Sequence, residues 1–531
     1  MKRLLISALV FCTAAANIQD TIDLGYSKYK GVSLTNGITQ WQGIRYAAPP
    51  IGNLRFAPPQ DPEYVAAVQT ADTKQKYCLE TGAPVSSSAT SEDCLFLNVQ
   101  TPSNATSTSK LPVYLFIQGG GFNKNSNPNI NASGLIAASG YGIVVVDLNY
   151  RVGPYGFLSD GDKVTPNIGL LDQRKVFKWV QDHISKFGGD PGHVVLGGIS
   201  AGAESIALHL TANHATDEGF FHAAAAESPS FATTLTVSEA QYLYRNFATR
   251  LGCAGADSLA CMRNKTTAEL QAQNFNIPYP MASNPPNYLW TPIIDGTIVP
   301  DYQYKLFQSG KFIKVPTIYG DDANGGTIFT PKNTTTLAQS NQYILDSYPF
   351  LTLDQFDDIN EMYPNPNKTC PSIGCYWRQV SNVYQEVRYT CPALYITESQ
   401  TRFGVNNSYA YLWNVEDPAQ VAQGLGVPHT VEFNALLGSD YAKAPPDSYK
   451  PGQVNGGITP LMQHYWLNFI KTYSPNGRNS CNSKEVRWLP WYKSQGRLIF
   501  QTGATAEMVK LDDGLRKRCD FWFEHGVSMR L

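Results

Sequence analysis

Short apolar runs alternate with stretches of helix-forming residues along the middle of this chain. The apolar runs are typical of buried strands and cover 113–117, 142–149, 194–196 and 315–319. The helix-forming stretches cover 170–186 and 204–210. Strands that alternate with helices in this way predict βαβ units, and so a large, mostly parallel central β-sheet flanked by helices on both faces. The predicted fold class is therefore α/β.

The run at 194–196 leads directly into a Gly-X-Ser-X-Gly motif formed by Gly198, Ser200 and Gly202. Between a strand and a helix, this motif makes a sharp turn that lifts the serine hydroxyl clear of the sheet, where a base can reach it. The helix formers at 204–210 supply the second half of that context. The motif alone is also compatible with a plain glycine-rich loop, but strand, turn and helix together favour Ser200 as a nucleophile.

A second glycine-rich turn follows the predicted strand at 113–117, where the sequence continues from Gln118 into three glycines and Phe122. Glycines expose backbone N–H groups with no side chain in the way, which suits a developing oxyanion. We therefore expect Gly120 and Gly121 to provide two donors of an oxyanion hole, and Ala201, directly after the serine, to provide the third. Without the serine motif, these glycines would indicate only a flexible loop.

With these two turns, the sequence resembles the type-B carboxylesterases and lipases of the α/β-hydrolase fold, a family that includes cholinesterases and secreted fungal lipases. Besides the two turns, the resemblance is carried by the segments 43–50, 92–99, 149–151, 156–158, 167–173 and 187–191. It covers nearly the whole mature chain, and it implies hydrolysis of small-molecule carboxylic esters through an acyl-enzyme, without a cofactor. The sequence departs from many members at Gln118, where they carry histidine or tyrosine, and at Ile199, where they carry glutamate.

The same resemblance identifies His429 as the catalytic base, since it lies in the late histidine loop of the family. Its role is to take the proton of Ser200 during attack and to return it to the leaving alcohol. The remaining histidines are expected to be structural or exposed: His183, His193, His209, His214, His222, His464 and His525.

The third member of the triad departs from the family pattern. Gly325 occupies the position where the resemblance expects a glutamate, and a glycine can neither orient an imidazole nor stabilise its charged form. One hypothesis is that Asp321 or Asp322, predicted just beyond the strand at 315–319, replaces that acid; Glu432 is a second candidate. The other hypothesis is a weakened or non-hydrolytic protein that keeps the serine and the histidine without a complete relay.

Three functions follow from these motifs. The first is a serine carboxylesterase. The second is a binding or adhesion protein on the same scaffold, because the expected acid is missing. The third is an acyltransferase, which would share the acyl-enzyme but use an alcohol in place of water.

Composition and length agree with one large folded unit. The 531 residues would allow several domains, but the family motifs run from residue 43 to residue 434 without a linker, so we expect a single domain over 17–531. A hydrophobic content of 43% is enough for a substantial core. A net charge of −2 gives no indication of a nucleic-acid partner.

The N-terminus predicts secretion. A basic start, an apolar run over 4–12 and three alanines at 14–16 are typical of a signal peptide covering 1–16. The apolar run is too short for a membrane span, and no other stretch of the sequence is long and apolar enough to form one. We therefore expect an extracellular protein, with sugar acceptors at Asn104, Asn131, Asn264, Asn333, Asn367 and Asn406.

Secretion predicts disulfide bonds among the nine cysteines that follow Cys12. The family resemblance pairs Cys78 with Cys94, and Cys253 with Cys261. Two further pairs, Cys370 with Cys375 and Cys481 with Cys519, are working guesses that would leave Cys391 free. No metal site is expected, because no metal-ligand spacing occurs.

Two features bear on the substrate. In lipases of the family, the loop between the first two cysteines is an apolar lid, whereas the loop at 79–93 here is short and polar, which favours soluble esters. The aromatic residues Phe122, Tyr279, Tyr288 and Trp290 are candidates for an apolar acyl site, although aromatic residues in a chain this rich in them more often belong to the ordinary core.

Overall fold

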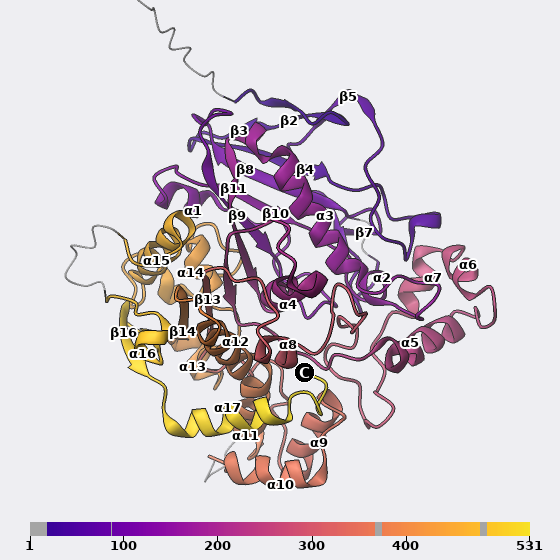
Figure 1. Cartoon of the computed structure of the whole chain (residues 1–531), viewed down its shortest axis with the longest axis vertical. Helices are drawn as coiled ribbons and strands as arrows, with labels where there is room; N and C mark the ends of the chain where they lie inside the picture. The colour runs from indigo at the N-terminus through magenta and orange to yellow at the C-terminus, as the bar shows by residue number, and fades with distance from the viewer. Residues whose placement is uncertain (1–17, 86–87, 367–373, 478–485) are drawn as a thin grey trace, which may run out of the picture.

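The largest element of the fold is an eleven-stranded sheet (Figure 1). The structure is a computed structural model that describes residues 18–85, 88–366, 374–477 and 486–531. From one edge of the sheet to the other the strands are β16 (Thr505–Lys510), β15 (Gly496–Gln501), β14 (Ser408–Asn414), β13 (Thr317–Asp322), β12 (Ala223–Glu227), β11 (Gly189–Ile199), β9 (Leu111–Ile117), β10 (Val144–Leu148), β8 (Phe96–Pro102), β4 (Ile38–Arg45) and β3 (Val32–Ser33). Two small sheets lie outside it and consist of β1 (Thr21–Asp23), β2 (Ser27–Lys30) and β5 (Val65–Thr70), and of β6 (Tyr77–Cys78) and β7 (Thr90–Ser91).

The central strands of the large sheet are parallel. Every neighbouring pair from β10 across to β15 runs in the same direction. The pairs at the two edges are antiparallel. They are β15 with β16 at one edge, and β3 with β4, β4 with β8 and β8 with β10 at the other. The predicted mostly parallel sheet is confirmed.

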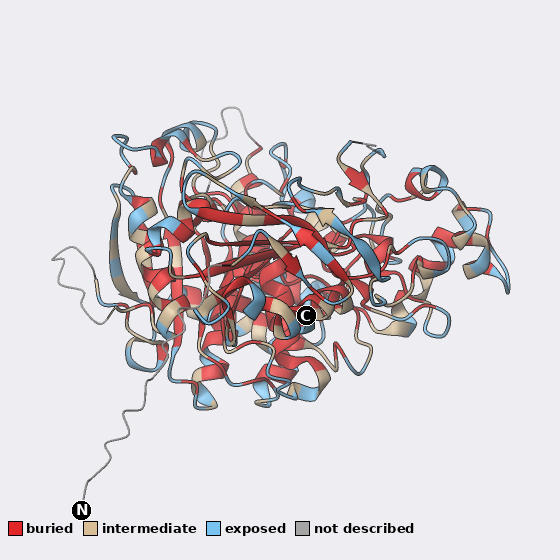
Figure 2. Cartoon of the chain, turned by 90° about the horizontal axis from the view of Figure 1, so that it is seen from above, coloured by how far each residue is buried: buried red, intermediate tan, exposed pale blue. Residues whose placement is uncertain are grey.

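Helices cover both faces of this sheet. On one face, side chains of α3 (Ile168–His183), α4 (Ala201–Ala215) and α12 (Cys391–Arg402) join one hydrophobic core. On the other face, α1 (Ser133–Ala138), α14 (Phe433–Leu437) and α15 (Ile458–Thr472) join a second core. Alternate residues of β9 belong to opposite cores, as the two-residue repeat of a strand requires. Figure 2 shows buried residues concentrated in the sheet and on the helix faces turned toward it.

Further α-helices complete the described part of the chain. They are α2 (Pro154–Phe157), α5 (Val237–Arg250), α6 (Ser258–Arg263), α7 (Thr267–Ala272), α8 (Gln303–Gln308), α9 (Leu337–Ser347), α10 (Leu353–Met362), α11 (Trp377–Gln385), α13 (Pro418–Ala422), α16 (Trp491–Ser494) and α17 (Asp513–His525). A five-residue π-helical turn at Glu386–Thr390 joins α11 to α12. Threonine capping boxes begin α5, α7, α9 and α10, where the threonine hydroxyl and a Glu or Gln side chain satisfy free N–H groups.

Strand β13 is longer than the apolar run that predicted it. It continues through Asp321 and Asp322, which pair in register with Leu412 and Trp413 of β14. The two aspartates therefore lie within the strand, and the prediction that placed them beyond its end is wrong. Because successive side chains of a strand point to opposite faces, the two carboxylates point away from each other.

Disulfide bonds cross-link the chain over both short and long sequence separations. The expected pairs Cys78–Cys94 and Cys253–Cys261 are present. Cys519 of α17 is bonded to Cys391 at the start of α12, so the guess that paired it with Cys481 is wrong. Cys375 is also disulfide-bonded, whereas Cys370 and Cys481 lie outside the described residues, as do the predicted signal peptide and Asn367.

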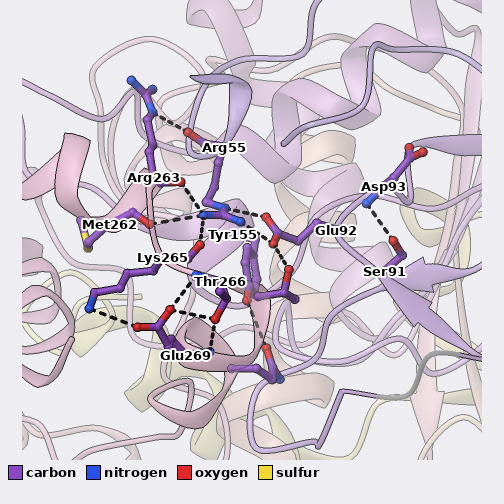
Figure 3. A network of polar contacts seen from close by, with 12 residues as sticks. Arg55, Ser91, Glu92, Asp93, Tyr155, Met262, Arg263, Lys265, Thr266 and Glu269 are labelled. Carbon is purple, nitrogen blue, oxygen red and sulfur yellow. Dashed lines mark hydrogen bonds and ion pairs between the residues drawn. The ribbon is translucent and has the colours of Figure 1, made fainter. Parts of the chain in front are cut away.

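A buried ion pair ties the first disulfide loop to the end of α6 (Figure 3). Arg55 donates to both carboxylate oxygens of Glu92, at 2.6 and 2.7 Å. The same guanidinium donates to the backbone carbonyls of Arg263 and Lys265, each at 2.7 Å, and Thr267 donates to Glu92. Glu92 belongs to one of the family segments, and its contacts with Arg55 and Thr267 show that it has a structural role.

Within the described part of the chain, no helix has the length and apolar character needed to cross a membrane, and no cluster of His, Cys, Asp and Glu could hold a metal ion. The five described glycosylation motifs begin at asparagines that are all exposed: Asn104, Asn131, Asn264, Asn333 and Asn406.

Candidate active site

Ser200 lies at the turn between β11 and α4, in a backbone conformation that serine rarely adopts. Its φ of 54° and ψ of −120° give the sharp turn that the Gly-X-Ser-X-Gly motif predicts. The flanking glycines have no room for a side chain: a Cβ at Gly202 would lie 2.0 Å from the carbonyl oxygen of Ile117, and a Cβ at Gly198 would lie 2.6 Å from that of Gly202. The spacing of the motif is thus required by close backbone packing.

The triple-glycine turn after β9 packs directly against Ser200. A Cβ at Gly119 would lie 2.8 Å from the Cβ of Ser200. Gly120 and Gly121 have φ values of 117° and 58°, which favour glycine. Among the hydrogen bonds of the described residues, none uses the N–H groups of Gly120, Gly121 or Ala201 as donors. Three free donors beside a nucleophile are what an oxyanion hole requires.

His429 lies in the loop before α14, between two aromatic rings. The ring of Tyr389 is 4.2 Å away between centroids, and that of Phe329 is 5.2 Å away. Both imidazole nitrogens are buried and have no hydrogen-bond partner, so His429 is not hydrogen-bonded to Ser200 in this structure. In enzymes without substrate, such catalytic hydrogen bonds are often long and tighten only when substrate binds.

Burial lowers the pKa of His429 from 6.5 to about 3, and the positive charge of Arg388 contributes to the same effect. The imidazole is therefore neutral at physiological pH, which is the form that a general base needs. Its charged form is strongly disfavoured.

Gly325 lies beside this histidine. A Cβ built on Gly325 would be 3.8 Å from the Cα and the Cβ of His429, and 3.7 Å from Cδ2 of Tyr389, all ordinary van der Waals distances. The position that the family resemblance assigns to the acid is thus next to the imidazole, and a glycine leaves it without a carboxylate.

Neither aspartate of β13 replaces the missing acid in this structure, because neither is hydrogen-bonded to the unpartnered ring of His429. Asp321 accepts a hydrogen bond from Thr390 and lies 3.5 Å from Nη1 of Arg497. Asp322 points to the other face and accepts a hydrogen bond from the backbone N–H of Thr430, at 2.6 Å. Asp322 therefore holds the backbone of the histidine loop and not its ring.

Glu432, the other candidate acid, takes part in a buried cluster with Asp322. The hydroxyl of Ser228 lies within hydrogen-bond distance of both carboxyls, 3.1 Å from Asp322 and 3.2 Å from Glu432, and Tyr411 donates to Glu432 at 3.2 Å. Burial raises the pKa of both carboxyls, and the charge of Glu432 raises that of Asp322 further. Two buried carboxyls this close together favour a shared proton, because sharing it reduces the buried charge.

One charged residue at the site was missed by sequence reasoning. Arg388 is only 4% exposed, and its Nε donates to Oγ of Ser230 at 2.9 Å. The backbone N–H of Ser230 in turn donates to the carbonyl oxygen of Ser200, at 3.3 Å. No motif marks this arginine, because it reaches the site through the π-helical turn, which apolar periodicity does not reveal.

The aromatic candidates separate into different environments. A Cβ at Gly121 would lie 2.3 Å from the ring of Tyr288, so Tyr288 packs on the oxyanion turn. Tyr279 lines an apolar cavity of about 250 Å³, Trp290 packs on Phe247 in the core, and Phe122 packs on Phe157. Tyr288 alone among these four contacts the site.

Comparisons with known proteins agree with this geometry. The profile of the Carboxylesterase family matches residues 22–522. A crystal structure of EstA from Aspergillus niger superposes with a TM-score of 0.92 at 40% sequence identity and covers 97% of this chain and 99% of that one. Lipase 2 of Geotrichum candidum is 31% identical over 96% of this chain and 97% of its own length. Secreted lipase 4 of Gibberella zeae is 26% identical over 96% of this chain and 93% of its own length.

Proposed function

Since the chain belongs to the carboxylesterase family, and is on that ground a carboxylic-ester hydrolase, we propose that it works through an acyl-enzyme on Ser200 with His429 as the base. The observation that carries this proposal is the arrangement of Ser200 in its strained turn beside three free N–H groups.

The reaction follows from the chemistry of these groups. His429 accepts the hydroxyl proton as Oγ of Ser200 bonds to the ester carbonyl carbon, and the N–H groups of Gly120, Gly121 and Ala201 stabilise the oxyanion. When the tetrahedral intermediate collapses, the carbon–oxygen bond to the alcohol breaks and the alcohol takes the proton from the imidazole. Water then repeats the sequence on the acyl-enzyme and releases the acid.

In this proposal Ser200 and His429 act as a dyad without a third acid. Asp322 is a positioning residue, since it binds the N–H of Thr430 and so fixes the backbone of the histidine loop. The absence of a carboxylate at Gly325 predicts a low turnover, because losing the acid of such a triad can cost about 10⁴-fold. The short polar loop at 79–93 favours soluble esters as substrates.

The proposal extends to the location and organisation of the protein. A signal peptide at 1–16, a single domain over 17–531 and secretion are consistent with several observations. These are the disulfide bonds, the exposed glycosylation motifs and the similarity to a protein named as a secreted lipase.

A fluorophosphonate probe tests the nucleophile. We expect it to label the wild-type protein and not Ser200→Ala, while Ser238→Ala, a change at an exposed serine of α5, keeps the label. Absence of labelling in folded wild-type protein would contradict the proposal and favour the binding or adhesion function. Product analysis with an added alcohol distinguishes hydrolysis from acyl transfer, since only transfer yields an ester of that alcohol.

A further inference from the structure

Arg388 is a buried cation that forms no salt bridge with a carboxylate in the described part of the chain. Among the described residues, other buried arginines have one: Arg55 pairs with Glu92, and Arg151 with Asp172. Arg388 takes part in none of the ion pairs of the described chain. Burying a charge without a counter-ion is costly, so a cation in this state marks a place where an anion is expected.

The neighbours of Arg388 are aromatic rings and hydroxyls. Its guanidinium lies over the rings of Tyr288, at 5.4 Å, and Tyr384, at 5.6 Å, and its Nε donates to the hydroxyl of Ser230. Glu204 is a carboxyl group close enough to interact electrostatically with Arg388, although the two form no salt bridge. Burial raises the pKa of Glu204 to about 8 while Arg388 lowers it, so burial weakens the contribution of Glu204 to balancing the charge.

This cation borders both halves of the reacting centre. Tyr288, which lies beneath it, packs on the oxyanion glycine Gly121. The next residue along the chain, Tyr389, packs on the ring of His429. Through Ser230, Arg388 is also connected to the backbone of Ser200. A group bound to Arg388 would therefore lie close to an ester held at the serine.

We infer that Arg388 binds a carboxylate of the substrate, so that the preferred substrates are esters that carry a carboxylate group near the reacting carbonyl. This inference rests on the proposed function. A carboxylate matches the planar guanidinium in shape and balances its single charge, whereas a phosphate dianion would bring one charge too many.

The same carboxylate would assist the reaction. The charge of Arg388 opposes formation of the imidazolium at His429, and a bound anion offsets that opposition during proton transfer. The substrate would thus bring to the site a negative charge that the chain lacks at Gly325. A positively charged site that is completed by its own substrate also discriminates against neutral esters.

Matched substrate pairs test the inference. Monoethyl adipate is compared with ethyl adipamate, in which a carboxamide replaces the carboxylate, so that the charge is on the acyl side. The acetate ester of 4-hydroxybenzoate is compared with that of 4-hydroxybenzamide, so that the charge is on the alcohol side. We expect kcat/KM to be about 10- to 100-fold higher for the anionic member of at least one pair, the range of a charged hydrogen bond.

Variants of the arginine assign that preference. Arg388→Gln should reduce it to about onefold, and Arg388→Lys, which keeps the charge, should retain part of it. Arg245→Gln removes an exposed charge on α5 and should leave it unchanged. Circular dichroism and the thermal midpoint establish that each variant is folded. If Arg388→Gln does not fold, the ratio in Arg388→Lys and calorimetric binding of monoethyl adipate to Ser200→Ala still decide the question.

Each outcome has one meaning. Equal rates for both members of both pairs, with active enzyme and a labelled Ser200, would overturn the role of Arg388 and leave the proposed function intact. Acceleration of neutral esters by added acetate, without a preference for anionic esters, would overturn it as well, since the anion would then come from solution. No hydrolysis and no labelling would contradict the proposed function itself. A preference that survives in Arg388→Gln would also overturn the inference.

Discussion

Gly325→Glu is expected to increase the turnover of this enzyme, whereas most changes beside a catalytic histidine reduce it. The backbone at Gly325 does not require a left-handed conformation, and a Cβ there makes only ordinary contacts with His429 and Tyr389. A glutamate at this position can direct its carboxylate toward the unpartnered imidazole. It would orient the ring and stabilise its charged form, as the acid of a serine triad does.

The size of the effect follows from the pKa of His429. A lowering from 6.5 to about 3 corresponds to roughly 5 kcal/mol that opposes the imidazolium, at about 1.4 kcal/mol per pKa unit. If a new carboxylate offsets about half of this in the transition state, kcat rises by roughly 10²-fold. The loss of about 10⁴-fold on disabling such an acid sets the upper limit.

The assay is hydrolysis of 4-nitrophenyl butyrate from pH 5 to 9, with kcat and KM determined at each pH. In the wild-type enzyme, His429 is neutral over this whole range, so it produces no acidic limb. In Gly325→Glu the carboxylate raises the pKa of His429 toward its ordinary value. The loss of activity toward low pH should therefore begin at a higher pH than in the wild-type enzyme, because the base becomes protonated.

Gly325→Gln is the matched control, since it has nearly the same shape without the charge. The reasoning is refuted if Glu and Gln change kcat equally, or if Glu lowers kcat while the variant remains folded. In the latter case the space beside Gly325 would serve the substrate and not the relay.

Three further outcomes follow from the fold. Burial raises the pKa of Asp147 to about 7, so its ionisation destabilises the native state progressively as the pH rises from about 4 to 7. Asp147→Asn removes this cost and should raise the free energy of unfolding by up to about 4 kcal/mol at pH 8 and by little at pH 4. Urea titration at the two pH values measures the difference. Replacing Cys391 and Cys519 by serine opens a loop of 128 residues and should lower stability by about 5 kcal/mol in the chain-entropy model, with unchanged stability as the opposing result. Gly121→Ala should reduce kcat at least about 10²-fold with little effect on KM, because its Cβ would lie 2.3 Å from the ring of Tyr288; full activity would contradict the assigned oxyanion turn.

The parts of the site that sequence predicts are those determined by local backbone geometry. The turn at Ser200 and the triple-glycine turn depend on glycines at fixed spacings, and each glycine meets a neighbouring backbone or ring at less than 3 Å if given a side chain. The alternation of apolar runs and helix formers is likewise local, and it predicts the parallel sheet without knowledge of the contacts.

The parts that sequence does not predict depend on contacts between distant segments. The direction of Asp321 and Asp322 was not foreseeable, because β13 continues past its apolar run by pairing with β14. The bond between Cys391 and Cys519 joins residues 128 positions apart, for which no spacing rule exists. Arg388 enters the site through a π-helical turn, which shifts the face of the helix that points inward.

The glycine at position 325 and the arginine at position 388 act on His429 in the same direction. The first leaves a negative charge out of the surroundings of the imidazole, and the second brings a positive charge in. If they were independent losses, each would lower activity without any gain. They become consistent with a working esterase when a negative charge arrives with the substrate, because the same anion balances Arg388 and stabilises the imidazolium. The glycine at the acid position and the cation without a salt bridge then both contribute to a selectivity for anionic esters.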